Sequence, residues 1–267
     1  MMRHLLAVLA VALPCTGLAS GTHSLSCLPL RNWDVFSTVA VQVGTPPQIF
    51  ELVADTGSTS LLLQSCSCQQ LGSCPMTFGK CFLGTGVSST FELAPEWLDW
   101  SGNPSVWILT YGSGDIEAVD ATDVVTVGNE TIAMNSSLLL MVAQTLGFDF
   151  QFEGILGLGL NSLKSADGVF DPPSFIAQAG VRRFSMCFNL NGEGALRLNT
   201  EEQPKYMGVN SSYHWTLGMD GLSLEDSDGF EQISACRTEA GSHAGNGCSA
   251  IFDSGTTLLT GPESSLL

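Results

Sequence analysis

The stretch that decides the fold is Phe50–Thr59, with the sequence FELVADTGST. A mainly apolar run ends in Asp55, and small hydroxylated residues and a glycine follow it at once. The same order returns near the other end of the chain in Ala250–Thr257, AIFDSGTT. One copy would describe an ordinary exit from a strand into a turn. Two copies, each after an apolar run and each followed by a pair of leucines, predict two carboxylates brought face to face by two similar lobes.

The composition limits the class of function. The chain has 267 residues, a formal net charge of −17 and 44% hydrophobic residues, which suits one or two domains with a buried core. Only nine Lys and Arg stand against 26 Asp and Glu, and they are scattered along the chain. Because phosphate binding needs clustered Lys and Arg, we expect no nucleic-acid partner.

Residues 1–24 have the features of a secretory signal peptide. Arg3 and His4 form a positive start, Leu5–Leu13 a short apolar segment, and small residues around Ala19 a cleavage region. A membrane span needs about 20 apolar residues, which neither this segment nor any later one approaches. We therefore expect no stable membrane span and a place in the secretory pathway, either extracellular or in an acidic vacuole or lysosome.

The cysteines fit such an oxidising compartment. Eight of the nine remain after the signal peptide, at positions 27, 66, 68, 74, 81, 187, 236 and 248. Zinc binding by the dense group at 66–81 is disfavoured, because Cys-x-x-Cys pairs and a nearby His are absent, so we expect disulfides and no metal. Cys66 and Cys68 are not expected to bond each other, and each should reach Cys74, Cys81 or Cys27. Three glycosylation sequons, at Asn129, Asn135 and Asn210, agree with secretion.

Short apolar runs separated by closely spaced turns predict an all-β architecture. A polar run at 199–204 is the expected boundary between lobes. Glycines between apolar residues at 152–159 indicate close backbone approach in a core. The predicted strands cover 35–43, 49–54, 61–63, 138–142, 184–190, 194–198 and 215–224, with a hairpin over 106–127 and one short helix over 172–180.

From about Val35 onward the chain resembles the pepsin-like aspartic endopeptidases. Asp55–Ser58 and Asp253–Thr256 look like the two catalytic motifs of that family. Tyr111–Gly114 looks like the tip of the flap that closes over substrate, and Ile155–Gly157 like the element that packs under the first aspartate. The four motifs occur in the family's order, which makes the resemblance specific.

The resemblance implies a bilobal double-psi β-barrel fold. It assigns residues 25–198 to a complete N-terminal lobe and 199–267 to a partial C-terminal lobe, because the chain ends soon after Asp253 whereas the family continues. It also implies a small disulfide loop between Cys236 and Cys248. In the plant-type branch of the family, Cys187 would find its partner beyond this chain.

The expected chemistry follows from two neighbouring carboxyl groups, which cannot both ionise readily and so share one proton. The ionised member would take a proton from the attacking water, and the protonated member would donate to the peptide carbonyl oxygen. Asp55 and Asp253 are the predicted pair. The expected supporting residues are Ser58 and Thr256 on the outer carboxylate oxygens, Thr56 and Ser254 between the loops, Gly57 and Gly255 at tight turns, and Tyr111 and Gly112 on the flap.

The resemblance implies a monomeric, cofactor-free aspartic endopeptidase that cleaves proteins or peptides at acidic pH. The alternatives are a catalytically silent pepsin-like binding or inhibitor protein, and an inactive truncated fragment of a protease. Silent relatives usually lose an aspartate or its glycine, and both motifs are whole here, which favours the enzyme. One departure concerns the flap, because Leu62 stands where the family has a Trp that hydrogen-bonds the flap tyrosine. Asp115, Asp149 and Glu153 are expected to face solvent.

Overall fold

Strands dominate the structure, a computed structural model, and the all-β prediction is confirmed. The predicted signal peptide, Asp149, the sequon at Asn210 and the predicted Cys236–Cys248 disulfide lie outside the described residues. The structure describes residues 26–74, 80–146, 153–160, 173–200, 214–219, 222–226, 229–233, 248–258 and 260–261.

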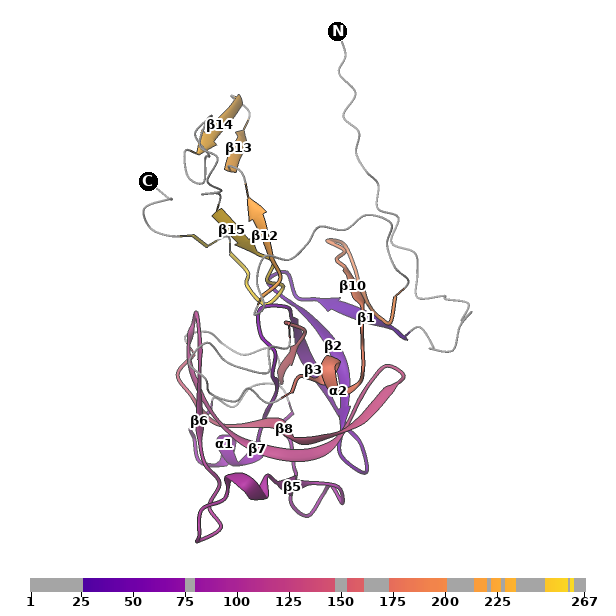
Figure 1. The fold of residues 1–267 in the computed structure, drawn as a ribbon, viewed down its shortest axis with the longest axis vertical. Helices are drawn as coiled ribbons and strands as arrows, with labels where there is room; N and C mark the ends of the chain where they lie inside the picture. Colours follow the sequence, from indigo (N-terminus) through magenta and orange to yellow (C-terminus); the bar gives the residue numbers. More distant parts are fainter. Residues whose placement is uncertain are drawn as a thin grey trace.

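The elements follow one another along the chain as labelled in Figure 1. The described strands are β1 (Ser26–Asn32), β2 (Ser37–Val43), β3 (Gln48–Asp55), β4 (Leu61–Gln64), β5 (Glu92–Leu93), β6 (Trp107–Tyr111), β7 (Gly114–Val127), β8 (Glu130–Gln144), β9 (Gly154–Gly157), β10 (Phe184–Cys187), β11 (Gly194–Leu198), β12 (Thr216–Met219), β13 (Leu222–Asp226), β14 (Gly229–Ile233) and β15 (Cys248–Ile251). The short helices are α1 (Cys66–Gln70), α2 (Phe175–Gln178) and the 3-10 turn η1 (Pro95–Trp97).

Six strands close into a ring, which forms the barrel at the lower part of Figure 1. Around the ring β2 pairs with β3, β3 with β9, β9 with β4, β4 with β8, β8 with β7, and β7 with β2 again. The β3–β9 and β4–β8 pairs are parallel and the others are antiparallel. Closure leaves these strands no free edge, so their backbone groups are paired inside the protein. β1, β11 and β10 continue the sheet from β2, and β5 and β6 pair with β7.

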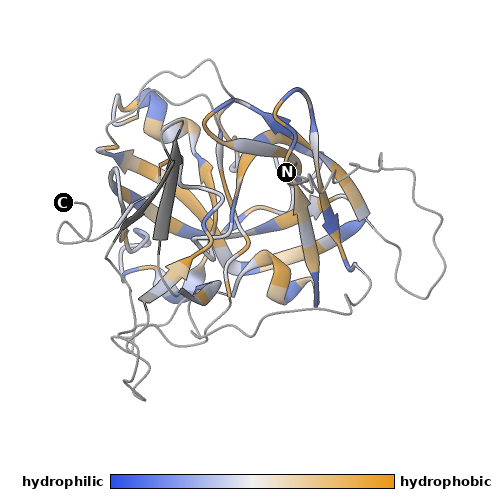
Figure 2. Cartoon of the chain, turned by 90° about the horizontal axis from the view of Figure 1, so that it is seen from above, coloured by the Kyte–Doolittle hydropathy of each residue, from blue (hydrophilic) through white to orange (hydrophobic). Residues whose placement is uncertain are grey.

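The central strands are buried on both faces. Successive side chains of a strand point to opposite sides, so Leu61 and Leu63 of β4 enter the larger core cluster and Leu62 enters the smaller one. This double burial explains why β3, β4 and β9 read as continuous apolar runs in the sequence. Figure 2 shows hydrophobic residues concentrated along the barrel strands.

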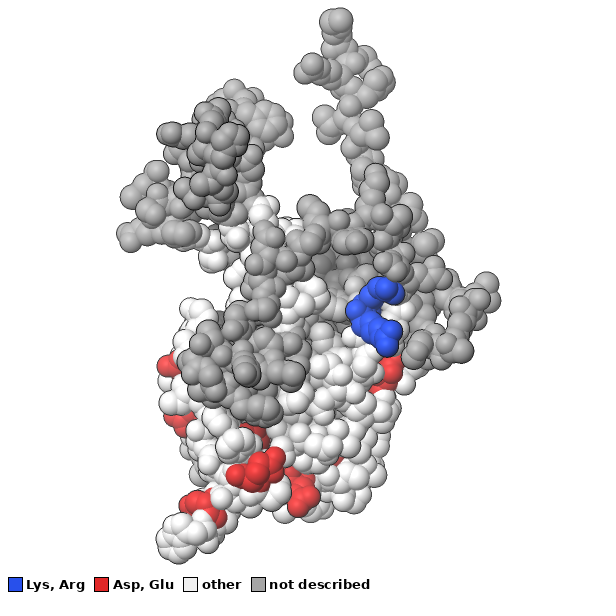
Figure 3. Space-filling model, viewed as in Figure 1, with Lys and Arg blue, Asp and Glu red and all other residues white. Residues whose placement is uncertain are grey.

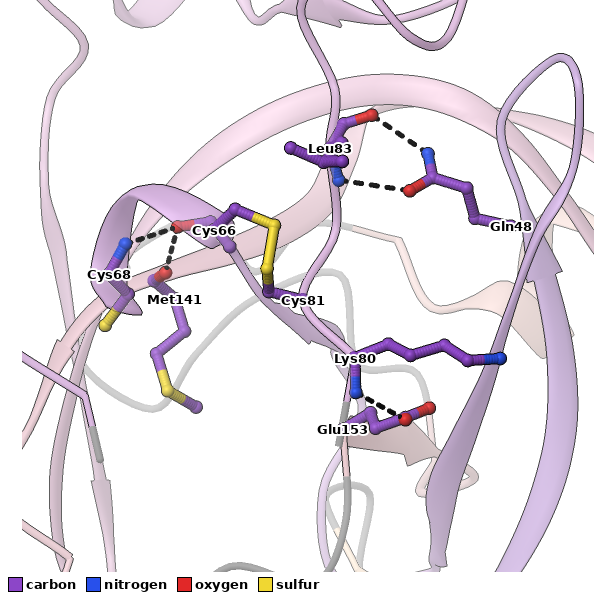
Figure 4. The surroundings of a disulfide bond; sticks show 9 residues. Gln48, Cys66, Cys68, Lys80, Cys81, Leu83, Met141 and Glu153 are labelled. Carbon is purple, nitrogen blue, oxygen red and sulfur yellow. Dashed lines mark hydrogen bonds between the residues drawn. A yellow bond between two sulfur atoms is a disulfide. The ribbon is translucent and has the colours of Figure 1, made fainter. Parts of the chain in front are cut away.

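The cysteine-dense segment contains a short helix where the sequence predicted only a loop. The Ser65 side chain accepts a hydrogen bond from the backbone N–H of Cys68 and so caps α1. Two disulfides join Cys66 to Cys81 and Cys68 to Cys74, and Figure 4 shows the first of them beside β4. The prediction that Cys66 and Cys68 do not bond each other is confirmed.

Glu153 corrects one expectation, because its side chain is buried and does not face solvent. Its carboxylate accepts backbone N–H groups from Glu51 and from Lys80, each at 2.7 Å, and Figure 4 shows the Lys80 contact. Glu153 therefore fastens the end of the cysteine segment to β3, since a buried carboxylate is stabilised by such charge-assisted bonds.

Several predicted strands differ in extent from the observed ones. The strand expected at 138–142 lies within the second half of β8, and the run at 215–224 is split between β12 and β13. β1 was not predicted. The β12–β15 pair and the β13–β14 hairpin form two separate small sheets, which Figure 1 shows at one end of the molecule, away from the barrel.

The barrel core makes a stability prediction. Leu63 is fully buried in the larger cluster, so Leu63→Ala should lower the free energy of unfolding by about 2–5 kcal/mol through lost burial and a residual cavity. Denaturant unfolding followed by circular dichroism measures the loss. Leu190→Ala is the matched control, because Leu190 is 91% exposed, and its effect should stay within about 0.5 kcal/mol. Equal losses in the two variants would contradict this assignment of the core.

Candidate active site

Asp55 is the last residue of β3, which pairs with β9 at this position. It lies opposite Gly157 in the parallel β3–β9 register, and its carbonyl accepts the N–H of Leu158 at 2.6 Å. Its carboxylate accepts the N–H of Gly57 at 2.8 Å and the hydroxyl of Ser58 at 2.5 Å. Only 6% of Asp55 is exposed, so the barrel delivers a carboxyl group that is buried and fixed in orientation.

Asp253 has an equivalent set of donors in the second motif. Its carboxylate accepts the N–H of Gly255 at 2.8 Å and the hydroxyl of Thr256 at 2.5 Å. The motif follows β15, whose continuation Phe252 donates its N–H to the carbonyl of Trp215 at 2.9 Å. The structure therefore gives each carboxylate one backbone donor and one hydroxyl donor, the hydroxyls being those of Ser58 and Thr256.

Thr56 and Ser254 join the two loops by reciprocal hydrogen bonds. The N–H of Thr56 donates to Oγ of Ser254 at 3.0 Å, and the N–H of Ser254 donates to Oγ1 of Thr56 at 2.9 Å. Each hydroxyl then donates across the interface, Thr56 to the carbonyl of Phe252 at 2.7 Å and Ser254 to that of Ala54 at 2.6 Å. The predicted contact is present, and it links positions that are 198 residues apart.

Gly57 and Gly255 are required by space at this contact. A Cβ on Gly57 would lie 2.5 Å from the Asp253 carboxyl group, and one on Gly255 would lie 2.4 Å from Oδ1 of Asp55. The sequence suggested tight turns as the reason for these glycines, but neither has a left-handed φ. Each glycine instead faces the aspartate of the other motif, which brings the two carboxyl groups together.

The two carboxyl groups differ in proton affinity. Burial, opposed by the hydrogen bond from Ser58 and reinforced by the neighbouring Asp253, raises the pKa of Asp55 to about 6. For Asp253 burial acts in the same direction, but hydrogen bonds from Thr256, Asp55 and the backbone outweigh it and lower its pKa below the usual value. These opposite shifts favour Asp55 over Asp253 as the holder of a shared proton below about pH 6.

Tyr111 ends β6 at the tip of the β6–β7 hairpin. It pairs with Gly114 across a two-residue turn formed by Gly112 and Ser113, and a Cβ on Gly112 would meet only open space. Burial, followed by the charge of Asp55, raises the pKa of the Tyr111 hydroxyl, and the neighbouring Ser58 side chain opposes the rise. The sequence left the resting partner of Tyr111 open because Leu62 cannot donate, and the structure places Tyr111 near Ser58 of the first motif.

A large apolar cavity lies beside the second motif. Its volume is about 930 Å³, and its walls include Thr56, Asp253 and Ser254 together with Trp215 and Phe252. Neither Asp55 nor Tyr111 lines it, so it is not the space between the hairpin and the two carboxyl groups.

The described ranges contain no cluster of three or more His, Cys, Asp or Glu side chains placed to hold a metal ion. Nor does any described helix have the length and apolarity needed to cross a membrane. On the face shown in Figure 3, Asp and Glu lie at several places over the barrel, and one group of Lys and Arg lies near β1 and β10.

Comparison with known proteins connects this geometry to a family. The family model described as eukaryotic aspartyl protease matches residues 38–267 of the chain. Cathepsin D of Chionodraco hamatus is 31% identical over 241 residues, which cover 84% of this chain and 54% of that protein. Pepsin A-5 of Mus musculus is 29% identical over 253 residues, covering 90% of this chain and 58% of that protein. The chain thus spans about half the length of the curated relatives it matches.

The carboxyl pair makes a titration prediction with a defined sign. Asp253→Asn removes a carboxylate that raises the pKa of Asp55, so that pKa should fall below about 6, while burial keeps it above its ordinary value. Ser58→Ala removes a hydrogen bond that favours ionised Asp55, so the pKa should rise in this variant. NMR titration of ¹³C-labelled aspartate carboxyl carbons measures both shifts. Shifts of the same sign in the two variants would contradict the assignment.

Proposed function

Because the chain belongs to the eukaryotic aspartyl protease family, which matches residues 38–267, we propose that it is an endopeptidase that hydrolyses peptide bonds with Asp55 and Asp253. The observation that carries the proposal is the contact in which the glycine of each motif faces the aspartate of the other. Two carboxyl groups in one site, with unequal proton affinities, are the equipment for acid and base catalysis of one reaction.

The proposed mechanism assigns different roles to the two aspartates. Asp253, ionised and less buried, takes a proton from a water molecule as that water attacks the carbonyl carbon of the substrate. Asp55, which holds the shared proton, donates to the carbonyl oxygen as the tetrahedral intermediate forms. The raised pKa of Asp55 and the lowered pKa of Asp253 support this division. Ser58 and Thr256 keep the outer oxygens occupied, so that the inner oxygens face the water.

The β6–β7 hairpin is proposed to act as a flap over bound peptide, with Tyr111 and Gly112 at its tip. The contact of Tyr111 with Ser58 supports this role, because it brings the tip to the first aspartate. An extended peptide under the flap would be shielded from bulk water, which strengthens the hydrogen bonds made during the reaction.

The substrate and setting are proposed at the same level. We infer a monomeric enzyme of the secretory pathway, with lobes at residues 25–198 and 199–267, acting on proteins or peptides. Two disulfides, Cys66–Cys81 and Cys68–Cys74, support an oxidising compartment. The sequon residues Asn129 and Asn135 are both exposed, as glycan attachment requires.

The pH dependence of peptide cleavage tests the mechanism. Activity should fall as pH rises through about 6, because Asp55 then loses the proton that it must donate, and it should also fall in strong acid as Asp253 becomes protonated. Cleavage of a denatured protein substrate between pH 2 and 8, by the protein expressed to its native stop codon, measures the profile. A statine-type transition-state inhibitor should abolish the cleavage.

Variants separate this enzyme from a silent binding protein. Asp55→Asn and Asp253→Asn should each lower kcat by about 10³-fold, because each removes a proton-transfer group. Asp115→Asn is the control, since Asp115 is an exposed carboxylate on the flap hairpin. Cleavage that survives Asp55→Asn would overturn the proposed mechanism. Inhibitor binding without cleavage would favour the binding protein.

A further inference from the structure

A second buried carboxyl group, Asp120, lies at the base of the flap hairpin. Asp120 belongs to β7 and is only 4% exposed. Its Oδ2 accepts the indole N–H of Trp107 on the neighbouring strand β6. Its Oδ1 is buried and has no hydrogen-bond partner within the described residues. A carboxylate in this position is costly when ionised, because only half of it is compensated.

Trp107 connects this carboxyl group to the flap tip. Trp107, Leu109 and Tyr111 alternate along β6 and pack against the smaller core cluster, so they lie on one face of the strand. Trp107 pairs with Ala118 in the β6–β7 register. The hydrogen bond from Trp107 to Asp120 therefore fixes the start of the strand whose other end carries Tyr111.

The turn η1 and the residue before it contact Trp107 and Asp120. The ring of Trp97 meets that of Trp107 edge to face at 5.1 Å and 85°. The backbone N–H of Ala94 donates to the carbonyl of Asp120 at 3.1 Å. Asp120 thus lies where β6, β7 and η1 meet, and a change in its charge acts on all three.

The charges that face Asp120 come mainly from η1. Glu96 is the neighbouring carboxylate, and a hydrogen bond from Ser136 lowers the pKa of Glu96, so it stays ionised in acid. On β5 the acidic residue is Glu92, which is paired with Thr122. The stretches of β6 and β8 beside Asp120, 107–110 and 136–144, carry no charged side chain.

We propose that Asp120 is a positioning residue for the flap, acting through the Trp107 indole, and that its protonation holds the hairpin more firmly in acid than at neutral pH. The role of the hairpin as a flap rests on the proposed function. Protonation removes the buried charge and its repulsion from Glu96, while the carbonyl oxygen continues to accept the indole N–H. The ligand of this site is a proton. Protonation of Asp120 favours a fixed flap in the acidic pH range where the aspartate pair is proposed to work.

The direction of the effect follows from linkage. Burial raises the pKa of Asp120 to about 6, with the Trp107 hydrogen bond opposing and Glu96 adding to it. A group whose pKa is raised by folding contributes stability that is complete below its unfolded pKa and is lost as pH rises through its folded pKa. The hairpin should therefore be most stable near pH 4 and loosen between pH 5 and 7.

Hydrogen exchange measures this directly. Mass spectrometry follows the protection of backbone amides in residues 105–118 from pH 4.5 to 7.5. The measurement is made on the wild type and on Asp120→Asn. The amide side chain stays neutral and still accepts the indole N–H, and comparison at each pH cancels the intrinsic exchange rate. The wild-type to variant protection ratio should fall by roughly 10- to 100-fold across this range, with a midpoint near pH 6.

Two further variants keep the test decisive. Trp107→Phe retains the ring but removes the N–H that favours ionised Asp120, so the midpoint of the remaining pH effect should move upward. Asp115→Asn alters an exposed carboxylate of the same hairpin and should leave the midpoint unchanged. A ratio of wild-type to Asp120→Asn protection that does not change with pH, or a midpoint that Trp107→Phe does not move, overturns the inference. Because exchange needs no substrate, this result is independent of whether peptide cleavage is found.

Discussion

The arrangement of the site depends on the contact between two loops that each carry an aspartate. A side chain at either Gly57 or Gly255 would occupy the position of the opposite carboxyl group. Four hydrogen bonds between the Thr56 and Ser254 loops hold that contact. The closed barrel positions this contact, because β9 pairs with β3 at the end of the strand, where Asp55 lies.

Two nearly identical motifs acquire different chemistry from their surroundings. Each aspartate accepts one backbone N–H and one hydroxyl, so the local motif does not distinguish them. Asp55 lies deeper, at the end of a barrel strand, and burial favours its neutral form. Unequal burial of equal motifs is therefore what separates the proton affinities of the two aspartates.

The β6–β7 hairpin has a side-chain contact at each of its ends. At its tip Tyr111 lies near Ser58 of the first motif. At its base Trp107 is tied to the buried carboxyl group of Asp120. These two contacts place the tip of the hairpin near the first aspartate motif and its base at the buried Asp120.

The sequence alone determined the elements that depend on local pattern. These include the two aspartate motifs, the hairpin with its tip, and the apolar strands of the barrel. Only the tertiary structure decided features that depend on close approach between distant residues. It paired Cys66 with Cys81 and Cys68 with Cys74, buried Glu153 against two backbone amides, and made space the reason for Gly57 and Gly255. Burial and long-range contact leave no periodic signal in the chain, which is why Asp120 reads as an ordinary strand residue until its neighbours are in place.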